Sequence, residues 1–354
     1  MILLVFILQH ISYSQSCLPE GITFSTQAEI DSFQINYPDC TEIEGTVVVS
    51  GVDITNLVGL SVLTSVGEYL EINNNDSLSS LTGLDNLTSV RDLWIHRNEL
   101  LTNLSGLENV VSITRDLWIY FNDSLASLNG LENVNFIAGG LRINKNNNLI
   151  SLSGLDNLTT VRKFLEIEHN ESLVSLTALN KLTSIGDNLI IWNNAVLANL
   201  TGLNNIDAGS IIGLGIAENP NLSNCEVESI CNYLSSPIGE ILISDNAPGC
   251  NDQEEIVKAC EGSSVDEIDI SNQLSIYPNP FSTSTTIEYE LQNSEFVTVT
   301  ILSNLGKQIM MIREKQSSGK QQITWNANEN PSGVYYLTIQ AGRQFASGKI
   351  LLVR

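Results

Sequence analysis

One phrase recurs seven times between Leu57 and Ser223. It reads L-x-G-L-x-x-(L/V/I), then a short variable stretch, then L-x-I-x-x-N. The steps are 24, 23, 24, 24, 24 and 24 residues, and the repeats begin at Leu57, Leu81, Leu104, Leu128, Leu152, Leu176 and Leu200. A constant period in this range indicates a solenoid, in which each coil is stable only against its neighbours. Such a fold presents a long surface, which suits binding better than catalysis.

Within each coil, the L-x-I-x segment alternates apolar and variable residues, which predicts a strand with one buried face. Stacked at about 4.8 Å per coil, these strands would form one parallel sheet. An Asn follows each Ile by three residues, at positions Asn75, Asn98, Asn122, Asn146, Asn170, Asn194 and Asn219. Because an amide both donates and accepts hydrogen bonds, we expect these side chains to point inward and satisfy the backbone of each turn. The Gly of L-x-G-L predicts a tight bend, although repeat six carries Ala178 there.

Six cysteines flank the repeats, and none lies within them: Cys17, Cys40, Cys225, Cys231, Cys250 and Cys260. In an exported chain this placement predicts disulfides that staple terminal caps at 15–56 and 224–260 on either side of the coils at 57–223. Cys17 and Cys40 are expected to pair, and the last four allow three connectivities. No C-x-x-C pair and no nearby His completes a zinc site, so we predict neither metal nor cofactor. Helices are expected at 25–33, 226–234 and 253–259.

The first residues, 1–14, form a short apolar run that ends in small residues, which predicts a secretory signal peptide. No other segment is long and apolar enough to span a membrane. Up to residue 270 the chain has nine Lys and Arg against 35 Asp and Glu, and beyond it seven against five. An acidic body repels phosphate backbones, so nucleic acid is excluded as an expected partner.

The phrase L-x-x-L-x-L-x-x-N, preceded by the cysteine-bounded entry CTEIEGTVVVSG, is similar to the leucine-rich repeats of the receptor L-domain family. The resemblance covers Cys17 to about Cys260. It implies a right-handed parallel β-solenoid on a cell surface, and carries no particular ligand with it. The expected fold class is therefore predominantly β.

After an acidic linker at 261–273, short alternating segments at 285–291, 296–302, 308–312, 322–325, 334–339 and 344–353 predict a small antiparallel Ig-like sandwich. The motifs YPNPF, I-x-Y, LGK and PSGVYY follow one another in this region. Their order resembles the type A sorting domain of the type IX secretion system of Bacteroidota, here at 274–354. The resemblance implies the secretion machinery as a partner and export through the outer membrane. After processing, the cargo of such domains is either released or attached to surface lipopolysaccharide.

The variable positions of L-x-I-x should face outward, and three of the four Trp residues lie there. The candidate ligand-binding residues are Trp94, His96, Trp118, Tyr120, Arg142 and Trp192. Exposed aromatic rings bind partner proteins and stack on sugar faces. They also stabilise a sheet as cross-strand pairs, and both interpretations remain open.

An enzyme is not expected, because only two His residues lie beyond the signal peptide and no catalytic motif occurs. Glu166 and Glu168 could share the outward face as a glycosidase pair, but an open face has no walls to tune their pKa values. The sequence therefore predicts a secreted or cell-surface adhesion protein that recognises a glycan or protein. The alternative is a structural matrix component without a discrete ligand.

Overall fold

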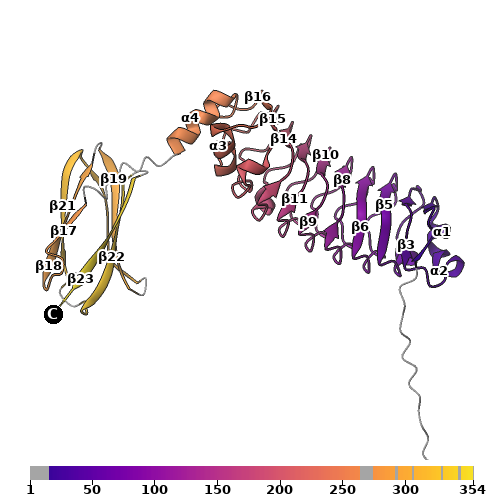
Figure 1. Ribbon diagram of the computed structural model, residues 1–354, viewed down its shortest axis with the longest axis horizontal. Helices are drawn as coiled ribbons and strands as arrows, with labels where there is room; N and C mark the ends of the chain where they lie inside the picture. The colour runs from indigo at the N-terminus through magenta and orange to yellow at the C-terminus, as the bar shows by residue number, and fades with distance from the viewer. Residues whose placement is uncertain are drawn as a thin grey trace, which may run out of the picture. The chain divides into compact units, whose positions relative to one another are not determined.

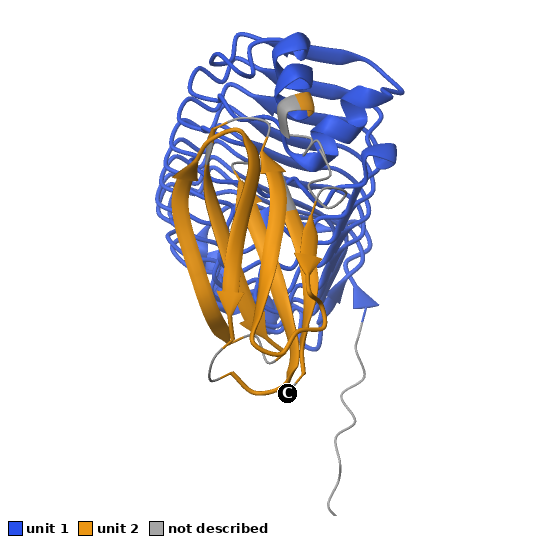
Figure 2. Cartoon of the chain, turned by 90° about the vertical axis from the view of Figure 1, so that its left-hand side faces the viewer, with its two compact units in different colours: residues 1–260 blue, residues 261–354 orange. Residues whose placement is uncertain are grey.

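The computed structural model describes residues 16–263, 274–291, 294–304, 307–327, 330–341 and 344–353. The chain divides into two compact units, Met1–Cys260 and Glu261–Arg354 (Figure 2). The expected signal peptide, 1–14, and residues 264–273 of the expected linker lie outside the described residues.

The first unit is a parallel β-solenoid, as the repeat predicts (Figure 1). One long column of strands contains the L-x-I-x segments, and corresponding residues pair in register, so that Leu93 lies beside Leu117 and Ile95 beside Ile119. The Leu and Ile side chains of these segments are at most 2% exposed. The column consists of β4 (Val47–Val49), β5 (Ser65–Asn73), β6 (Ser89–His96), β8 (Leu117–Tyr120), β10 (Leu141–Asn144), β12 (Leu165–Glu168), β14 (Leu189–Trp192), β15 (Leu214–Ala217) and β16 (Ile241–Ser244).

A second, shorter column of strands runs parallel to the first, and the L-x-I-x pattern does not predict it. It contains β3 (Glu42–Ile43), β7 (Ser112–Ile113), β9 (Phe136–Ile137), β11 (Thr160–Val161) and β13 (Ser184–Ile185). Strands β5 and β6 are long enough to belong to both columns. Single 3₁₀ turns complete three coils: η1 (Val58–Leu60), η2 (Thr177–Leu179) and η3 (Ala208–Ser210).

The seven repeated Asn residues lie in one fully buried ladder that joins the coils. At Asn146, the backbone N–H and Nδ2 both donate to Oδ1 of Asn170, at 3.1 and 3.4 Å. The same Nδ2 donates to the carbonyl of Ile119 at 3.0 Å, while Oδ1 accepts from the backbone N–H of Asn122 at 3.2 Å. One amide thus satisfies backbone groups of the preceding coil and of its own coil, where Nδ2 also donates to the carbonyl of Asn144, and it bonds the Asn170 side chain of the next coil.

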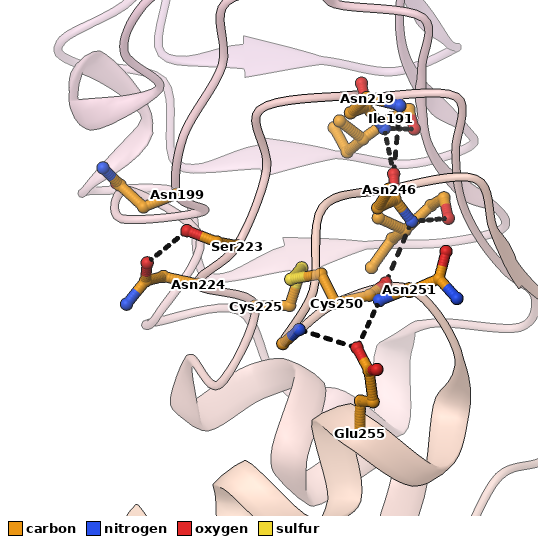
Figure 3. The surroundings of a disulfide bond; sticks show 12 residues. Ile191, Asn199, Asn219, Ser223, Asn224, Cys225, Asn246, Cys250, Asn251 and Glu255 are labelled. Carbon is orange, nitrogen blue, oxygen red and sulfur yellow. Dashed lines mark hydrogen bonds between the residues drawn. A yellow bond between two sulfur atoms is a disulfide. The ribbon is translucent and has the colours of Figure 1, made fainter.

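The ladder has an eighth member, Asn246, which the repeat phrase does not reveal (Figure 3). Its Oδ1 accepts from the backbone N–H and Nδ2 of Asn219, at 3.1 and 3.0 Å, and its Nδ2 donates to the carbonyl of Cys250 at 3.1 Å. Asn246 follows β16, so the segment expected as a cap also contains a further coil.

The glycines of L-x-G-L form the predicted bend because the coils approach closely there. Gly130 has a φ of +116°, and a Cβ on it would lie 2.1 Å from the carbonyl oxygen of Leu104 in the preceding coil. A side chain would therefore be excluded by both conformation and space. Coil six accepts Ala178 because its bend is the 3₁₀ turn η2 instead.

The N-terminal cap differs in detail from the expected single helix at 25–33. Thr26 is the N-cap, and it forms a capping box with Glu29 at the start of α1 (Gln27–Asp31). The segment then breaks at Ser32 and continues as α2 (Phe33–Asn36). Strands β1 (Ser16–Cys17) and β2 (Ile22–Phe24) complete the cap, and a disulfide joins Cys17 to Cys40.

The C-terminal cap is held by two disulfides, which select one of the three connectivities: Cys225 pairs with Cys250, and Cys231 with Cys260. The second bridge links α3 (Glu228–Ser235) to α4 (Gln253–Ser263). Figure 3 shows the first bridge beside the end of the Asn ladder, where Glu255 accepts hydrogen bonds from the backbone of Gly249 and Asn251.

The second unit is an antiparallel two-sheet structure, as predicted. The six expected strands occur, and β17 is added. One sheet is β17 (Ser275–Tyr277), β18 (Ser284–Leu291) and β21 (Gly319–Asn326), and the other is β20 (Gln308–Gln316), β19 (Glu295–Ser303), β22 (Gly333–Ala341) and β23 (Gln344–Leu352). Asn279 of the YPNPF motif donates to the carbonyl of Lys349 and accepts from the N–H of Leu351, so this motif fastens the start of the unit to its last strand.

We predict that Asn146→Ala strongly destabilises the solenoid. The substitution leaves the buried N–H of Asn122 and the carbonyl of Ile119 without their partners, and each unsatisfied group costs about 1–3 kcal/mol. Urea unfolding of the full chain, followed by circular dichroism, should show a clearly lower midpoint. The matched control is the neighbouring Asn147→Ala, because the Asn147 amide bonds only an exposed carboxylate. Equal midpoints for the two variants would contradict a structural ladder.

Candidate functional site

The outward side chains of the long strand column form the candidate site, which we call the strand face. Its first column of residues is Glu71, Trp94, Trp118, Arg142, Glu166, Ile190, Gly215 and Leu242, and its second is Asn73, His96, Tyr120, Asn144, Glu168, Trp192, Ala217 and Ser244. The parallel register places each residue directly beside its counterpart on the next coil. Neighbouring side chains of one column therefore stack.

Trp94 and Trp118 belong to a continuous aromatic stack. Their ring centroids lie 5.0 Å apart with the planes inclined by 11°, and Tyr69 stacks on the other face of Trp94 at 5.0 Å. The guanidinium of Arg142 lies 5.1 Å from the Trp118 ring and 5.5 Å from the ring of Phe164. We call Tyr69, Trp94, Trp118, Arg142 and Phe164 the aromatic stack. Other members of the stack lie against the faces of the Trp94 and Trp118 rings.

The indole N–H groups of Trp94 and Trp118 are buried and have no hydrogen-bond partner among the described residues. Arg142 at the far end pairs with Glu166, and the hydrogen bond from that pairing raises the pKa of the guanidinium. Because neighbouring side chains cover these rings, the stack resembles a sheet-stabilising ladder more than a surface with free ring faces. Each aromatic pair of this kind contributes about 0.5–1.5 kcal/mol beyond its buried area.

His96 and Tyr120 form a second stacked pair, with centroids 4.3 Å apart and planes inclined by 9°. His96 is only 5% exposed, which corrects the expectation that its side chain faces solvent. The side chain is covered because the imidazole lies flat against Tyr120, while its Nε2 lies 2.9 Å from Oε1 of Glu71. Burial lowers the pKa of His96, and the smaller opposing effect is its hydrogen bond to Glu71. Burial also raises the pKa of Tyr120.

The structure gives Glu166 and Glu168 different partners. Glu166 pairs with Arg142, and Glu168 accepts a hydrogen bond of 2.7 Å from Nδ2 of Asn144. Each carboxylate of the glycosidase pair considered from the sequence thus already interacts with a side chain on the preceding coil.

Trp192 differs from the other two strand-face Trp residues. Among the described residues it has no stacked ring or cation, since its neighbours in register are Glu168 and Ala217. Trp192 lines a hollow of about 520 Å³ together with Ile190, Gly215 and Leu242. Asn188 and Glu240 also line it. We call this the Gly215 hollow. It is open because Gly215 places no side chain on the strand face of β15.

Sequence reasoning named Trp192 but missed the hollow, Tyr69 and Phe164. Tyr69 and Phe164 each precede the first Leu of L-x-I-x, at a position that we had not assigned to the outward face. Phe164 reaches the stack because Gly140 leaves room for it: a Cβ on Gly140 would lie 2.2 Å from the Phe164 ring. The run G-L-G at 213–215 was the available signal for the hollow.

Comparison with known proteins informs the second unit. The family model of the secretion system C-terminal sorting domain matches residues 275–353. The second unit is similar to these sorting domains. This match supports export by the type IX secretion system, and it does not extend into the solenoid. No curated protein sequence matches the chain. Across the residues that the structure describes, no helix has the length and apolar character needed to cross a membrane.

The burial of His96 predicts a pH-dependent stability. The unfolded chain has an ordinary His pKa of about 6.5 and binds a proton more readily than the folded chain, so protonation favours unfolding. The free energy of unfolding should therefore be constant above about pH 7 and fall as the pH drops through about 6.5. His96→Phe keeps a ring against Tyr120 and removes the titration. Its urea midpoint should fall less than that of the parent between about pH 7.5 and 5.5, and parallel curves would contradict the assignment.

Proposed function

We propose that this chain is a secreted or cell-surface binding protein whose strand face holds a glycan or protein ligand. The sorting domain carries it out of the cell, and attachment to surface lipopolysaccharide after processing keeps it there. The observation that carries the proposal is the Gly215 hollow beside Trp192. An aromatic side chain without a stacking partner, next to an apolar hollow, is costly to leave in water and is typical of a binding surface.

The architecture of the solenoid supports binding rather than catalysis. We infer that it belongs to the receptor L-domain class, on the basis of its 24-residue coils and its cysteine-bounded caps. A catalytic role is not proposed, because the carboxylates of Glu166 and Glu168 are engaged by Arg142 and Asn144.

A structural matrix protein without a discrete ligand is the second candidate. The aromatic stack favours it, because the ring faces of Trp94 and Trp118 are used within the protein. The stack occupies coils at the N-terminal half of the strand face, whereas the Gly215 hollow lies at the other end. The two ends can therefore serve stability and binding separately.

The binding proposal is tested by presenting the full chain to arrays of polysaccharides and extracellular proteins. We expect capture by at least one array component, and loss of most of that capture for Ile190→Lys, which places a charge on the strand face. Val174→Lys is the matched control, because Val174 is a 50% exposed aliphatic residue outside that face. Absence of capture on both arrays, or equal capture by the two variants, would favour the structural role.

A further inference from the structure

The three strand-face Trp residues, Trp94, Trp118 and Trp192, differ in how far neighbouring side chains cover their rings. A ring that stacks on a neighbour presents only its edge, whereas a sugar needs the flat face of the ring. In the aromatic stack both faces of Trp94 are covered, by Tyr69 and Trp118, and both faces of Trp118 are covered, by Trp94 and Arg142. These rings are therefore unavailable as platforms.

Trp192 has the opposite surroundings. Its neighbour on β15 is Ala217, whose small side chain does not cover an indole, and the diagonal position is Gly215. Its indole N–H is not among the buried unpartnered atoms, in contrast to those of Trp94 and Trp118. Within the described part of the chain, Trp192 is thus the strand-face Trp on which neither a ring nor a cation is stacked.

Polar groups without intramolecular partners lie at the same hollow. The side chains of Asn188 and Glu240 line it, are exposed, and make no hydrogen bond within the described residues. The Asn188 amide extends over Gly213, where a Cβ would lie 2.5 Å from its Oδ1. Glycine at 213 therefore leaves the space that this amide occupies.

We propose that the Gly215 hollow binds a neutral pyranose ring, which stacks on Trp192 while its hydroxyls bond Asn188 and Glu240. This inference rests on the proposed binding function and names its site and ligand class. An apolar ring face edged by hydroxyls matches an indole edged by an amide and a carboxylate. The hollow's volume of about 520 Å³ lies within the range of about 300–1,000 Å³ typical of small-ligand sites.

Charge selects a neutral sugar over an acidic one. No Lys or Arg lines the hollow, Glu240 lies in its wall, and Glu168 is the neighbour of Trp192 on the preceding coil. A uronate or sulfated sugar would meet like charge there, and the net charge of the chain is −24. An apolar side chain of a partner protein would fit less well, because it would bury Asn188 and Glu240 without satisfying them.

A substitution at Gly215 can fill the hollow without removing any side-chain interaction. A Cβ at this position would meet only Ile190, at 3.6 Å, which is ordinary contact, and its backbone conformation suits any residue. Gly215→Val should therefore fold, with a urea midpoint at or above that of the parent, while its methyl groups occupy the space beside Trp192.

The experiment is calorimetric titration of the full chain with cello-, laminari-, xylo- and mannohexaose, and with hexagalacturonate as the acidic probe. We expect at least one neutral hexasaccharide to bind and the acidic one not to bind. Trp192→Ala and Gly215→Val should each weaken binding by about tenfold or more, since an aromatic anchor is lost or displaced. Trp192→Phe should recover part of the affinity. Trp118→Ala should lower stability and leave the affinity within about twofold.

The proposal is overturned if no neutral hexasaccharide binds, or if binding survives Gly215→Val with the variant folded. A stronger preference for hexagalacturonate would also overturn it. The outcome of the array experiment distinguishes failure of the sugar site from failure of the proposed binding function. If the strand face captures an extracellular protein in an Ile190-dependent way while no hexasaccharide binds, the binding function stands and the sugar site is wrong. If the arrays capture nothing either, both are wrong.

Discussion

The hydrogen bonds of the buried Asn ladder are the interaction on which the solenoid depends. A coil of 24 residues must turn sharply after each strand, and every turn leaves backbone N–H and carbonyl groups inside an apolar core. One amide per coil satisfies these groups and passes a hydrogen bond to the next coil, from Gly51 through to Asn246. Because this task is done by one repeated residue and the core by repeated Leu and Ile, the outward positions are free to vary.

The ladder also explains how much of the fold could be predicted from the sequence. The period, the strand pattern and the inward Asn recur at fixed spacing, so their physical roles follow from one coil. Asn246 was missed because its coil lacks the L-x-G-L phrase, although Ile241–Ser244 pairs with β15 as the others do. The second strand column was missed because its two-residue strands, such as Ser112–Ile113 and Thr160–Val161, are too short to show alternation.

The candidate site was less predictable, because it depends on what each outward residue touches. Alternation placed Trp94, Trp118 and Trp192 on one face, but it could not show that two of these rings stack on each other and that the third has no stacked neighbour. His96 appears in the same pattern and yet is buried against Tyr120. The hollow depends on the missing side chain of Gly215, and the alternation of apolar and variable residues, from which the strand face was predicted, gives no weight to such a position.

The strand face is therefore divided: a self-contained aromatic stack stabilises one end, and an unstacked ring beside a hollow offers binding at the other. Fluorine NMR of the full chain labelled with 5-fluorotryptophan tests this division directly, because its four signals report Trp94, Trp118, Trp192 and the core residue Trp325 separately. On titration with neutral hexasaccharides, the Trp192 signal should shift while the other three remain unchanged. In a separate titration of the sugar-free chain, a soluble paramagnetic relaxation agent should broaden the Trp192 signal most. Shifts at Trp94 and Trp118 with an unchanged Trp192 signal would contradict the account.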